Sequence, residues 1–404
     1  MRSIVKKAPQ KDPLANRSGR SVELLLELLA LPGASGAEGA VADFIVSRLE
    51  RAGLPAGAAK RDKAHRKSPL GGAAGNLIVR LPGTVRAPRR MLSAHMDTVP
   101  LCAGARPVQK GRRIVAADAA TALGGDDRAG CAVLLSTALA VLEEKLPHPP
   151  LTFLWTVQEE AGLQGARHVQ LPLLGRPALA FNWDGGPANR LTIGATGGYR
   201  MHIAVEGVAS HAGVHPERGV SAVAIASLAI ADLVAGGWHG LIEKGRRTGT
   251  SNVGVIRGGS ATNVVTDLVE IRAEARSHDP KFRAEIVRQI ERAFTKAARQ
   301  VRNVDRITGR VNFDGRLDYE SFRLNTSEAC VVTAAEAVEA ESREPDYAIA
   351  NGGLDANWLS HHGIPTVTLG CGQNAIHTTG EWLDLDEFDC ACRIARRIAT
   401  APEI

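Results

Sequence analysis

Continuous apolar runs alternate with segments of helical periodicity through the first half of the chain, and this alternation restricts the fold most. We expect strands at residues 76–81, 90–94, 151–157 and 178–183. We expect helices at residues 21–31, 38–52 and 127–142. Strands that are apolar on both faces must be covered on both faces, so the pattern predicts an α/β fold: a mixed, mainly parallel sheet flanked by helices.

The pattern changes after about Thr192 to strand, helix, strand, strand, helix, strand, which is typical of a small ferredoxin-like α+β unit. These elements are expected at residues 200–206, 220–234, 250–257, 267–276, 280–299 and 305–313. The α/β pattern then resumes with helices at 328–340 and 354–362 and a strand at 366–369, so the α+β unit is inserted. We expect a mobile arm at residues 1–18. One domain is expected in two parts, residues 19–194 and 319–404, with an inserted domain at residues 195–318 between them.

Composition and charge exclude a disordered protein and argue against nucleic-acid and membrane partners. Hydrophobic residues make up 44% and charged residues 23% of the 404 residues, which excludes wholesale disorder. The net charge is +6, but no long Lys/Arg run or known nucleic-acid motif appears, so we expect no nucleic-acid partner. No apolar run reaches the roughly 18 residues of a membrane span, so we expect no membrane partner.

The cysteines and the N-terminal stretch indicate in which cellular compartment the protein is expected. The six cysteines form no C-x-x-C pair, which is typical of reduced thiols. The N-terminal stretch is basic but lacks the apolar core of a signal peptide. We therefore expect a cytoplasmic protein.

Candidate metal ligands follow the expected strands or open a helix. They are His95, Asp126, Glu160, Asp184 and His377. The carboxyl ends of strands in an open α/β sheet form the edge where ligands bind. Two imidazoles and three carboxylates can hold two divalent cations, with one carboxylate bridging them. Nitrogen and oxygen ligands suit Zn²⁺, with Mn²⁺ or Co²⁺ as substitutes.

Four motifs around these residues resemble one known family. They are SAHMDTVP (93–100), GGDDRAG (124–130), TVQEEAGLQGA (156–166) and NAIHTTGEW (374–382). Their order and spacing are similar to those of the co-catalytic zinc metallopeptidases, which include peptidase T, glutamate-releasing carboxypeptidases and aminoacylases. The resemblance covers nearly the whole chain and implies a zinc-peptidase catalytic domain with an inserted lid domain.

The resemblance implies a metal role for all five candidates. Asp126 would bridge two zinc ions. Its neighbour Asp127 competes for that role, but the family's bridging residue aligns with the first Asp of the pair. The remaining ligands would each bind one zinc: His95, Glu160, Asp184 and His377.

The resemblance also implies two catalytic residues that do not bind metal. Asp97 would orient His95 by accepting the N–H of its other ring nitrogen. Glu159 would act as the general base, taking a proton from the attacking water and passing it to the leaving amine.

The inserted unit contains ASHAGVHPERG, which is similar to the family's lid motif. Its His211 would donate to the substrate carbonyl oxygen, often across a dimer interface, and so implies a homodimer through the lid domain. Asn263 and Arg276 fall where lid residues contact substrate, and Arg276 could pair with a substrate carboxylate. A solvated ion pair is nearly as good an explanation for Arg276. His215 has no family role, and Asp355 lies in a segment that resembles a loop supporting the site.

Within the family, the peptidase T-like branch fits best, which implies release of the N-terminal residue from short peptides such as tripeptides. The alternative is a carboxypeptidase or an N-acyl-amino-acid amidohydrolase with the same metals. An acidic group for the substrate amine would favour the aminopeptidase, and Arg276 holding a substrate carboxylate would favour the alternative. The stretch between His95 and Asp126 is short, which puts tripeptide selectivity in doubt. A scaffold protein that had lost catalysis would lack ligands or the base, and none is missing.

Overall fold

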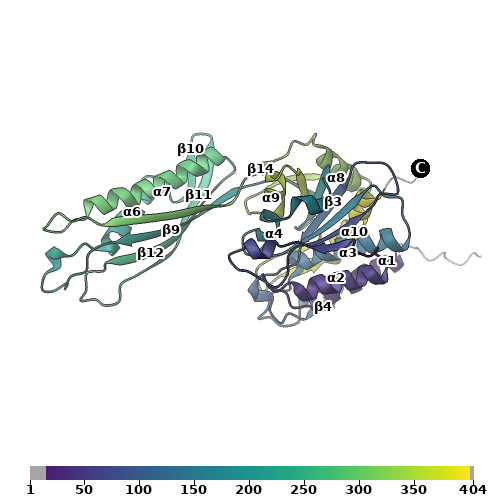
Figure 1. Ribbon diagram of the computed structural model, residues 1–404, viewed down its shortest axis with the longest axis horizontal. Coiled ribbons are helices and arrows are strands. Elements are labelled where there is room, and N and C mark those ends of the chain that lie inside the picture. The colour runs from purple at the N-terminus through teal and green to yellow at the C-terminus, as the bar shows by residue number, and fades with distance from the viewer. Residues whose placement is uncertain (1–14, 401–404) are drawn as a thin grey trace, which may run out of the picture. The chain divides into compact units, whose positions relative to one another are not determined.

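The computed structural model describes residues 15–400, which fold into two compact units (Figure 1). The first unit contains the chain up to Ile193, Leu324–Ala348 and the chain from Leu354 onward. The second contains Gly194–Arg323 and Ile349–Gly353. Most of the expected arm, residues 1–14, lies outside the described residues, and the first helix already begins at Ala15.

A nine-stranded mixed sheet forms the centre of the first unit, in the order β1-β2-β6-β3-β7-β16-β8-β14, with β15 also paired to β8. The four central strands β6, β3, β7 and β16 are parallel. The strands are β1 (Ala59–Arg61), β2 (Leu77–Leu81), β3 (Arg90–His95), β6 (Leu151–Thr156), β7 (Leu179–Trp183), β8 (Arg190–Ala195), β14 (Phe322–Arg323), β15 (Asp346–Ala350) and β16 (Thr366–Leu369). This confirms the predicted α/β fold with a mainly parallel centre.

Helices flank this sheet (Figure 1). They are α1 (Ala15–Leu29), α2 (Gly39–Arg51), α3 (Gly125–Glu143), α4 (Gln164–Arg167), α5 (Leu171–Leu174), α8 (Ala329–Glu339), α9 (Asp355–His361) and α10 (Leu385–Ala399), with short 3₁₀ turns η1 (Ala64–Lys67) and η2 (Pro100–Cys102). Helix α3 packs on β3 and also against α1 and α10. Each central strand is therefore buried along its length, as continuous apolar sequence requires.

A small antiparallel sheet, β17-β18-β5-β4, was not expected from the sequence. It contains β4 (Pro107–Lys110), β5 (Arg113–Ala116), β17 (Gln373–Asn374) and β18 (Trp382–Asp384). The short stretch between His95 and Asp126 thus carries a hairpin, whose strand β5 pairs with β18. This pairing joins the hairpin to the loop that contains His377.

The second unit is a five-stranded antiparallel sheet in the order β10-β11-β12-β9-β13, with two helices packed on it. Its elements are β9 (Gly197–Glu206), η3 (Pro216–Arg218), α6 (Ala222–Ala235), β10 (Gly240–Lys244), β11 (Arg247–Gly258), β12 (Leu268–Ser277), α7 (Pro280–Gln300) and β13 (Arg310–Tyr319). Strands β9, β11, β12 and β13 with α6 and α7 give the predicted ferredoxin-like arrangement, and β10 is an additional edge strand. The core between sheet and helices includes Ile271, Phe282 and Phe294.

Two elements differ from the sequence expectation for local reasons. Strand β13 begins at Arg310, later than expected, because the preceding residues form a turn in which Asn303 accepts a hydrogen bond from the N–H of Ile307 at 2.8 Å. Helix α10 was not expected. Asp384 caps it by accepting hydrogen bonds from two backbone N–H groups of its first turn.

None of the helices in the described part of the chain is both long and apolar enough to cross a membrane.

Replacing Phe153 by Ala is expected to lower the free energy of unfolding of the first unit by about 3–5 kcal/mol. Phe153 is fully buried in β6 and stacks on Trp155, so truncation leaves a cavity in the centre of the sheet. Urea denaturation followed by tryptophan fluorescence measures the change. The control Val332→Ala removes a side chain that is 39% exposed, and an equal loss in both variants would contradict the placement of Phe153.

Candidate functional site

The candidate ligands meet at the carboxyl edge of the parallel strands. His95 is the last residue of β3, while Glu160 and Asp184 follow the ends of β6 and β7. Asp126 lies at the start of α3, where residues 126 and 127 have non-helical backbone dihedral angles. Parallel strands bring their carboxyl ends to one edge, so residues far apart in the sequence become neighbours.

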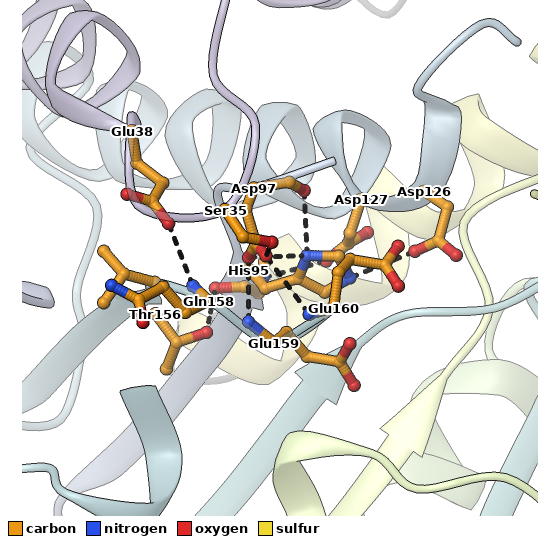
Figure 2. A network of polar contacts seen from close by, with 12 residues as sticks. Ser35, Glu38, His95, Asp97, Asp126, Asp127, Thr156, Gln158, Glu159 and Glu160 are labelled. Atoms are coloured by element: carbon orange, nitrogen blue, oxygen red, sulfur yellow. Dashed lines mark hydrogen bonds and ion pairs between the residues drawn. The ribbon is translucent and has the colours of Figure 1, made fainter. Parts of the chain in front are cut away.

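Asp126 lies between two imidazole rings. Its Oδ1 is 3.0 Å from Nε2 of His95, and its Oδ2 is 3.2 Å from Nε2 of His377. The same His377 nitrogen is 2.8 Å from Oε1 of Glu160. Ligand atoms of His95, Asp126 and Glu160 all lie within 4.8 Å of one another, and Figure 2 shows these three side chains together. Each carboxylate oxygen of Asp126 thus faces a different histidine, which is the arrangement of a bridging ligand.

The backbone at His377 has a φ of +62°, in the left-handed region that non-glycine residues rarely adopt. Such conformations persist where the surrounding structure holds them, often at functional sites. Hydrogen bonds to Asp126 and Glu160 raise the pKa of His377 to about 10. The imidazole ring of His377 therefore lies between two carboxylates, which favour its protonated form.

Asp184 belongs to the same acidic environment. Burial, followed by the charge of Asp126, raises the pKa of its carboxyl to about 8. Its backbone N–H donates to the carbonyl of Leu369 on β16 at 3.0 Å, which fixes the chain where it leaves β7. Asp184 is close enough to Asp126 and Glu160 for their charges to act on it.

Asp127 is turned away from this cluster. Its Oδ2 accepts the backbone N–H of His95 at 3.0 Å. Its Oδ1 accepts from the backbone N–H of Gly130 at 3.0 Å and from the side-chain amide of Gln373 at 2.9 Å. Both oxygens of this fully buried carboxylate are therefore used to hold the chain, whereas those of Asp126 face imidazoles.

Asp97 makes more contacts than the sequence indicated. Nδ1 of His95 lies 3.1 Å from the backbone carbonyl of Asp97 and 3.5 Å from its Oδ1. The carboxylate accepts shorter hydrogen bonds from the backbone N–H groups of Glu159 and Glu160, at 2.9 and 3.1 Å, and from the hydroxyl of Ser35 at 2.6 Å (Figure 2). Asp97 thus holds both the imidazole and the segment of consecutive glutamates.

Glu159 is placed by the same segment as Glu160 and, like Asp184 and His377, is not in the group of ligand atoms within 4.8 Å of one another. Burial raises the pKa of its carboxyl well above the usual range, and the charges of Asp184 and Asp355 add to this. Asp355 is buried beside it at the start of α9 and accepts a hydrogen bond from the hydroxyl of Thr156. Burial raises the pKa of Asp355 to about 6.

Together these groups form a dense set of carboxylates with little exposure. Burying several ionised carboxylates is costly unless cations or hydrogen bonds compensate their charge. Two imidazoles and several carboxylates suit divalent metal ions such as zinc, and ions bound here would supply the missing positive charge. The donor set therefore fits a divalent-metal site.

Glu381 was not singled out from the sequence beyond its place in NAIHTTGEW. Its Oε2 accepts the backbone N–H groups of Leu123 and Gly124, both at 2.8 Å, and its Oε1 accepts that of Asp126 at 3.1 Å. It therefore fixes the turn that presents Asp126. The only sequence signal is its position four residues after His377.

The lid candidates lie in the second unit and do not form one group. His211 pairs with Val264 in an isolated β-bridge, and the carbonyl of Asn263 accepts the next backbone N–H after His211 at 2.9 Å, so these two exposed residues are neighbours. Arg276 lies at the far end of β12, roughly 27 Å from the end near Asn263 at about 3.4 Å per residue. Both oxygens of Glu274 bind its guanidinium, at 3.0 and 3.1 Å.

The backbone N–H of His215 donates to the carbonyl of His211 at 3.0 Å, so His215 adjoins this pair. It is exposed, with its ring 3.3 Å from the carboxylate of Glu217.

Known proteins are similar to this chain over most of its length. A family model described as Peptidase family M20/M25/M40 matches residues 91–401. The Uncharacterized protein YqjE of Bacillus subtilis (strain 168) is 34% identical over 319 residues, which is 79% of this chain and 82% of that protein. The crystal structure of a tripeptidase from Staphylococcus aureus is 30% identical with a TM-score of 0.84, covering 95% of this chain and 97% of that one. The aminopeptidase PepT from Bacillus cereus is 30% identical with a TM-score of 0.82, covering 95% and 98%.

The family model covers well over half of the chain and includes all five candidate ligands. The similar structures extend over both units. The chain therefore belongs to peptidase family M20/M25/M40, as the resemblance of its four motifs implied, and is a metal-dependent peptidase.

Proposed function

We propose that the first unit is the catalytic unit and holds two zinc ions, with Mn²⁺ or Co²⁺ as substitutes. The proposed ligands are His95, Asp126, Glu160, Asp184 and His377. The observation that carries this proposal is the position of Asp126, whose two oxygens face two different imidazoles at 3.0 and 3.2 Å. A carboxylate placed in this way can bridge two ions.

We propose hydrolysis of a peptide bond with Glu159 as general base. Bound divalent cations lower the pKa of a water molecule and polarise the substrate carbonyl. Glu159 accepts a proton from the attacking water and delivers it to the leaving amine. Asp97 fixes the backbone of both Glu159 and Glu160, so the base and a ligand are positioned by one carboxylate.

The proposed substrate is a short peptide, with release of its N-terminal residue, most simply from a tripeptide. Support comes from the tripeptidase and the aminopeptidase, which are similar over 95% of this chain. The pairing of Arg276 with Glu274 also disfavours the alternative, a carboxypeptidase or N-acyl-amino-acid amidohydrolase, because Glu274 already neutralises the candidate carboxylate-binding group.

We propose that the second unit is the lid, with His211 as the donor to the developing oxyanion and Asn263 beside it. A homodimer through this unit is part of the proposal. Helix α6 supports it, because Val223, Leu228 and Val234 are 44%, 47% and 59% exposed on an almost wholly apolar helix. The absence of any disulfide among the six cysteines fits the proposed cytoplasmic location.

Asp126→Ala is expected to lower the bound metal from two ions per chain to one or none, because it removes the proposed bridge. Asp127→Asn is the matched control, since Asp127 holds backbone N–H groups instead. Inductively coupled plasma mass spectrometry after zinc loading and desalting measures the stoichiometry. Loss of metal in the Asp127 variant, with full metal content in the Asp126 variant, would reverse the assignment.

Glu159→Gln is expected to lower kcat by about 10²–10⁴-fold while both metal ions stay bound, because the amide cannot accept the proton. Glu160→Gln, one residue further along, should instead reduce metal content. Steady-state kinetics and metal analysis on the same preparations check both results. A Glu159→Gln enzyme with kcat within threefold of the wild type would remove Glu159 from its proposed role.

Zinc-loaded protein is expected to cleave Ala-Ala-Ala and its C-terminal amide at similar rates and to leave N-acetyl-Ala-Ala-Ala intact, because an aminopeptidase requires a free amine. Chromatography of the products identifies the bond cut. Loss of cleavage on amidation, or cleavage only of acylated single amino acids, would instead favour the carboxypeptidase or amidohydrolase.

A further inference from the structure

The chain that carries Glu159 and Glu160 is held by side chains from elsewhere in the fold. Strand β6 ends at Thr156, and the next four backbone N–H groups, residues 157–160, each donate to a side-chain oxygen. The acceptors are Oδ1 of Asn76 at 3.1 Å for residue 157, Oε1 of Glu38 at 3.0 Å for residue 158, and the two oxygens of Asp97 at 2.9 and 3.1 Å for residues 159 and 160.

Regular secondary structure does not fix this segment. Gln158 has a φ of +56°, so the chain takes a left-handed turn directly before the two glutamates. A non-glycine residue in that region is strained and persists only when neighbouring groups hold it. The carbonyls of residues 157–159 accept hydrogen bonds from the backbone N–H groups of residues 162–165. The side-chain acceptors hold the N–H groups of residues 157–160, so they share in fixing the direction in which the glutamates leave the strand.

Among these acceptors, Glu38 is a carboxylate whose charge no helix cap explains. It is the N-cap residue of α2, but its side chain makes no capping hydrogen bond to that helix. Its Oε1 instead accepts from the backbone N–H groups of Gly36 at 2.8 Å and Gln158 at 3.0 Å, as Figure 2 shows for the latter. The residue is fully buried, and its Oε2 has no hydrogen-bond partner within the described chain.

A buried carboxylate with one unsatisfied oxygen lowers the stability of the fold unless its other contacts compensate. On the side of the candidate site, Glu38 contacts Gln158, the residue directly before Glu159. We propose that Glu38 is a positioning residue of the reaction, holding Gln158 in its left-handed conformation so that Glu159 and Glu160 keep their separate directions.

This inference rests on the proposed function, because the base and ligand roles of the two glutamates are themselves proposals. The physical link is sensitivity to geometry: a displacement of about 1 Å at a reacting group can cost about 10²-fold in rate. The hydrogen bond from Gln158 requires an acceptor oxygen at Glu38 and no negative charge, so glutamine can replace glutamate there.

Glu38→Leu is expected to lower kcat by about 10–10²-fold with KM within threefold of the wild type, since substrate contacts are untouched. Glu38→Gln should retain kcat within about threefold, because its Oε1 still accepts. A control for general destabilisation is Glu341→Leu, which removes another largely buried carboxylate, bound to Arg393 and Arg397. Its kcat should stay near that of the wild type. Equal kcat in wild type and Glu38→Leu, or an equal loss in the leucine and glutamine variants, would overturn the proposal.

Hydrogen exchange of the metal-free proteins gives a readout that does not depend on activity. Peptides covering residues 157–160 should exchange faster in Glu38→Leu than in wild type, with the rest of the first unit unchanged. Faster exchange throughout that unit would show a purely structural role and overturn the proposal. Should the leucine variant fail to fold, Glu38→Asp, whose side chain is one methylene shorter, is expected to show the same local change and a smaller fall in kcat.

Absence of peptide hydrolysis by the wild type would overturn the proposed function itself. The exchange measurement would then still decide whether Glu38 holds the segment, so the two failures are distinguishable.

Discussion

The accumulation of carboxylates at one edge of the sheet is the constraint on which the rest of the structure depends. Three parallel strands end at this edge: β3 ends with His95, and Glu160 and Asp184 follow β6 and β7. Burial, and after it the charges of neighbouring carboxylates, raises the pKa of both Asp184 and Glu159. Only hydrogen-bond donors or cations stabilise such a set in its ionised form.

The carboxylates of the site have two kinds of close partner. Asp97, Asp127 and Glu381 accept backbone N–H groups and so stabilise the loops of the site. Asp126 and Glu160 face imidazole nitrogens instead. Backbone N–H groups stabilise the ionised form of the first group, whereas Asp126 and Glu160 have imidazole nitrogens as partners. The acids that backbone N–H groups do not bind are therefore the ones that the proposed metal ions would stabilise.

The sequence predicted those features that follow from local pattern. Continuous apolar strands predicted the covered sheet, and the strand at residues 366–369 has the expected bounds. The hairpin β4–β5 was missed because its strands are four residues long, β4 is largely exposed, and only one residue of β5 is buried. Glu38 and Glu381 could not be recognised for another reason. Their hydrogen-bond partners lie 120 and more than 250 residues away, and only the tertiary fold brings them together.

In the sequence, only the family's motif distinguishes the roles of Asp126 and Asp127. They are adjacent and chemically identical, and no propensity or periodicity distinguishes them. In the fold, the start of α3 directs one carboxylate towards two imidazoles and the other towards the backbone N–H of His95 and Gly130. The groups that fix this choice belong to β3, α3, β17 and the loop between β17 and β18. The division of roles between neighbouring acids is therefore a property of the assembled sheet edge, because each donor reaches it along a different part of the chain.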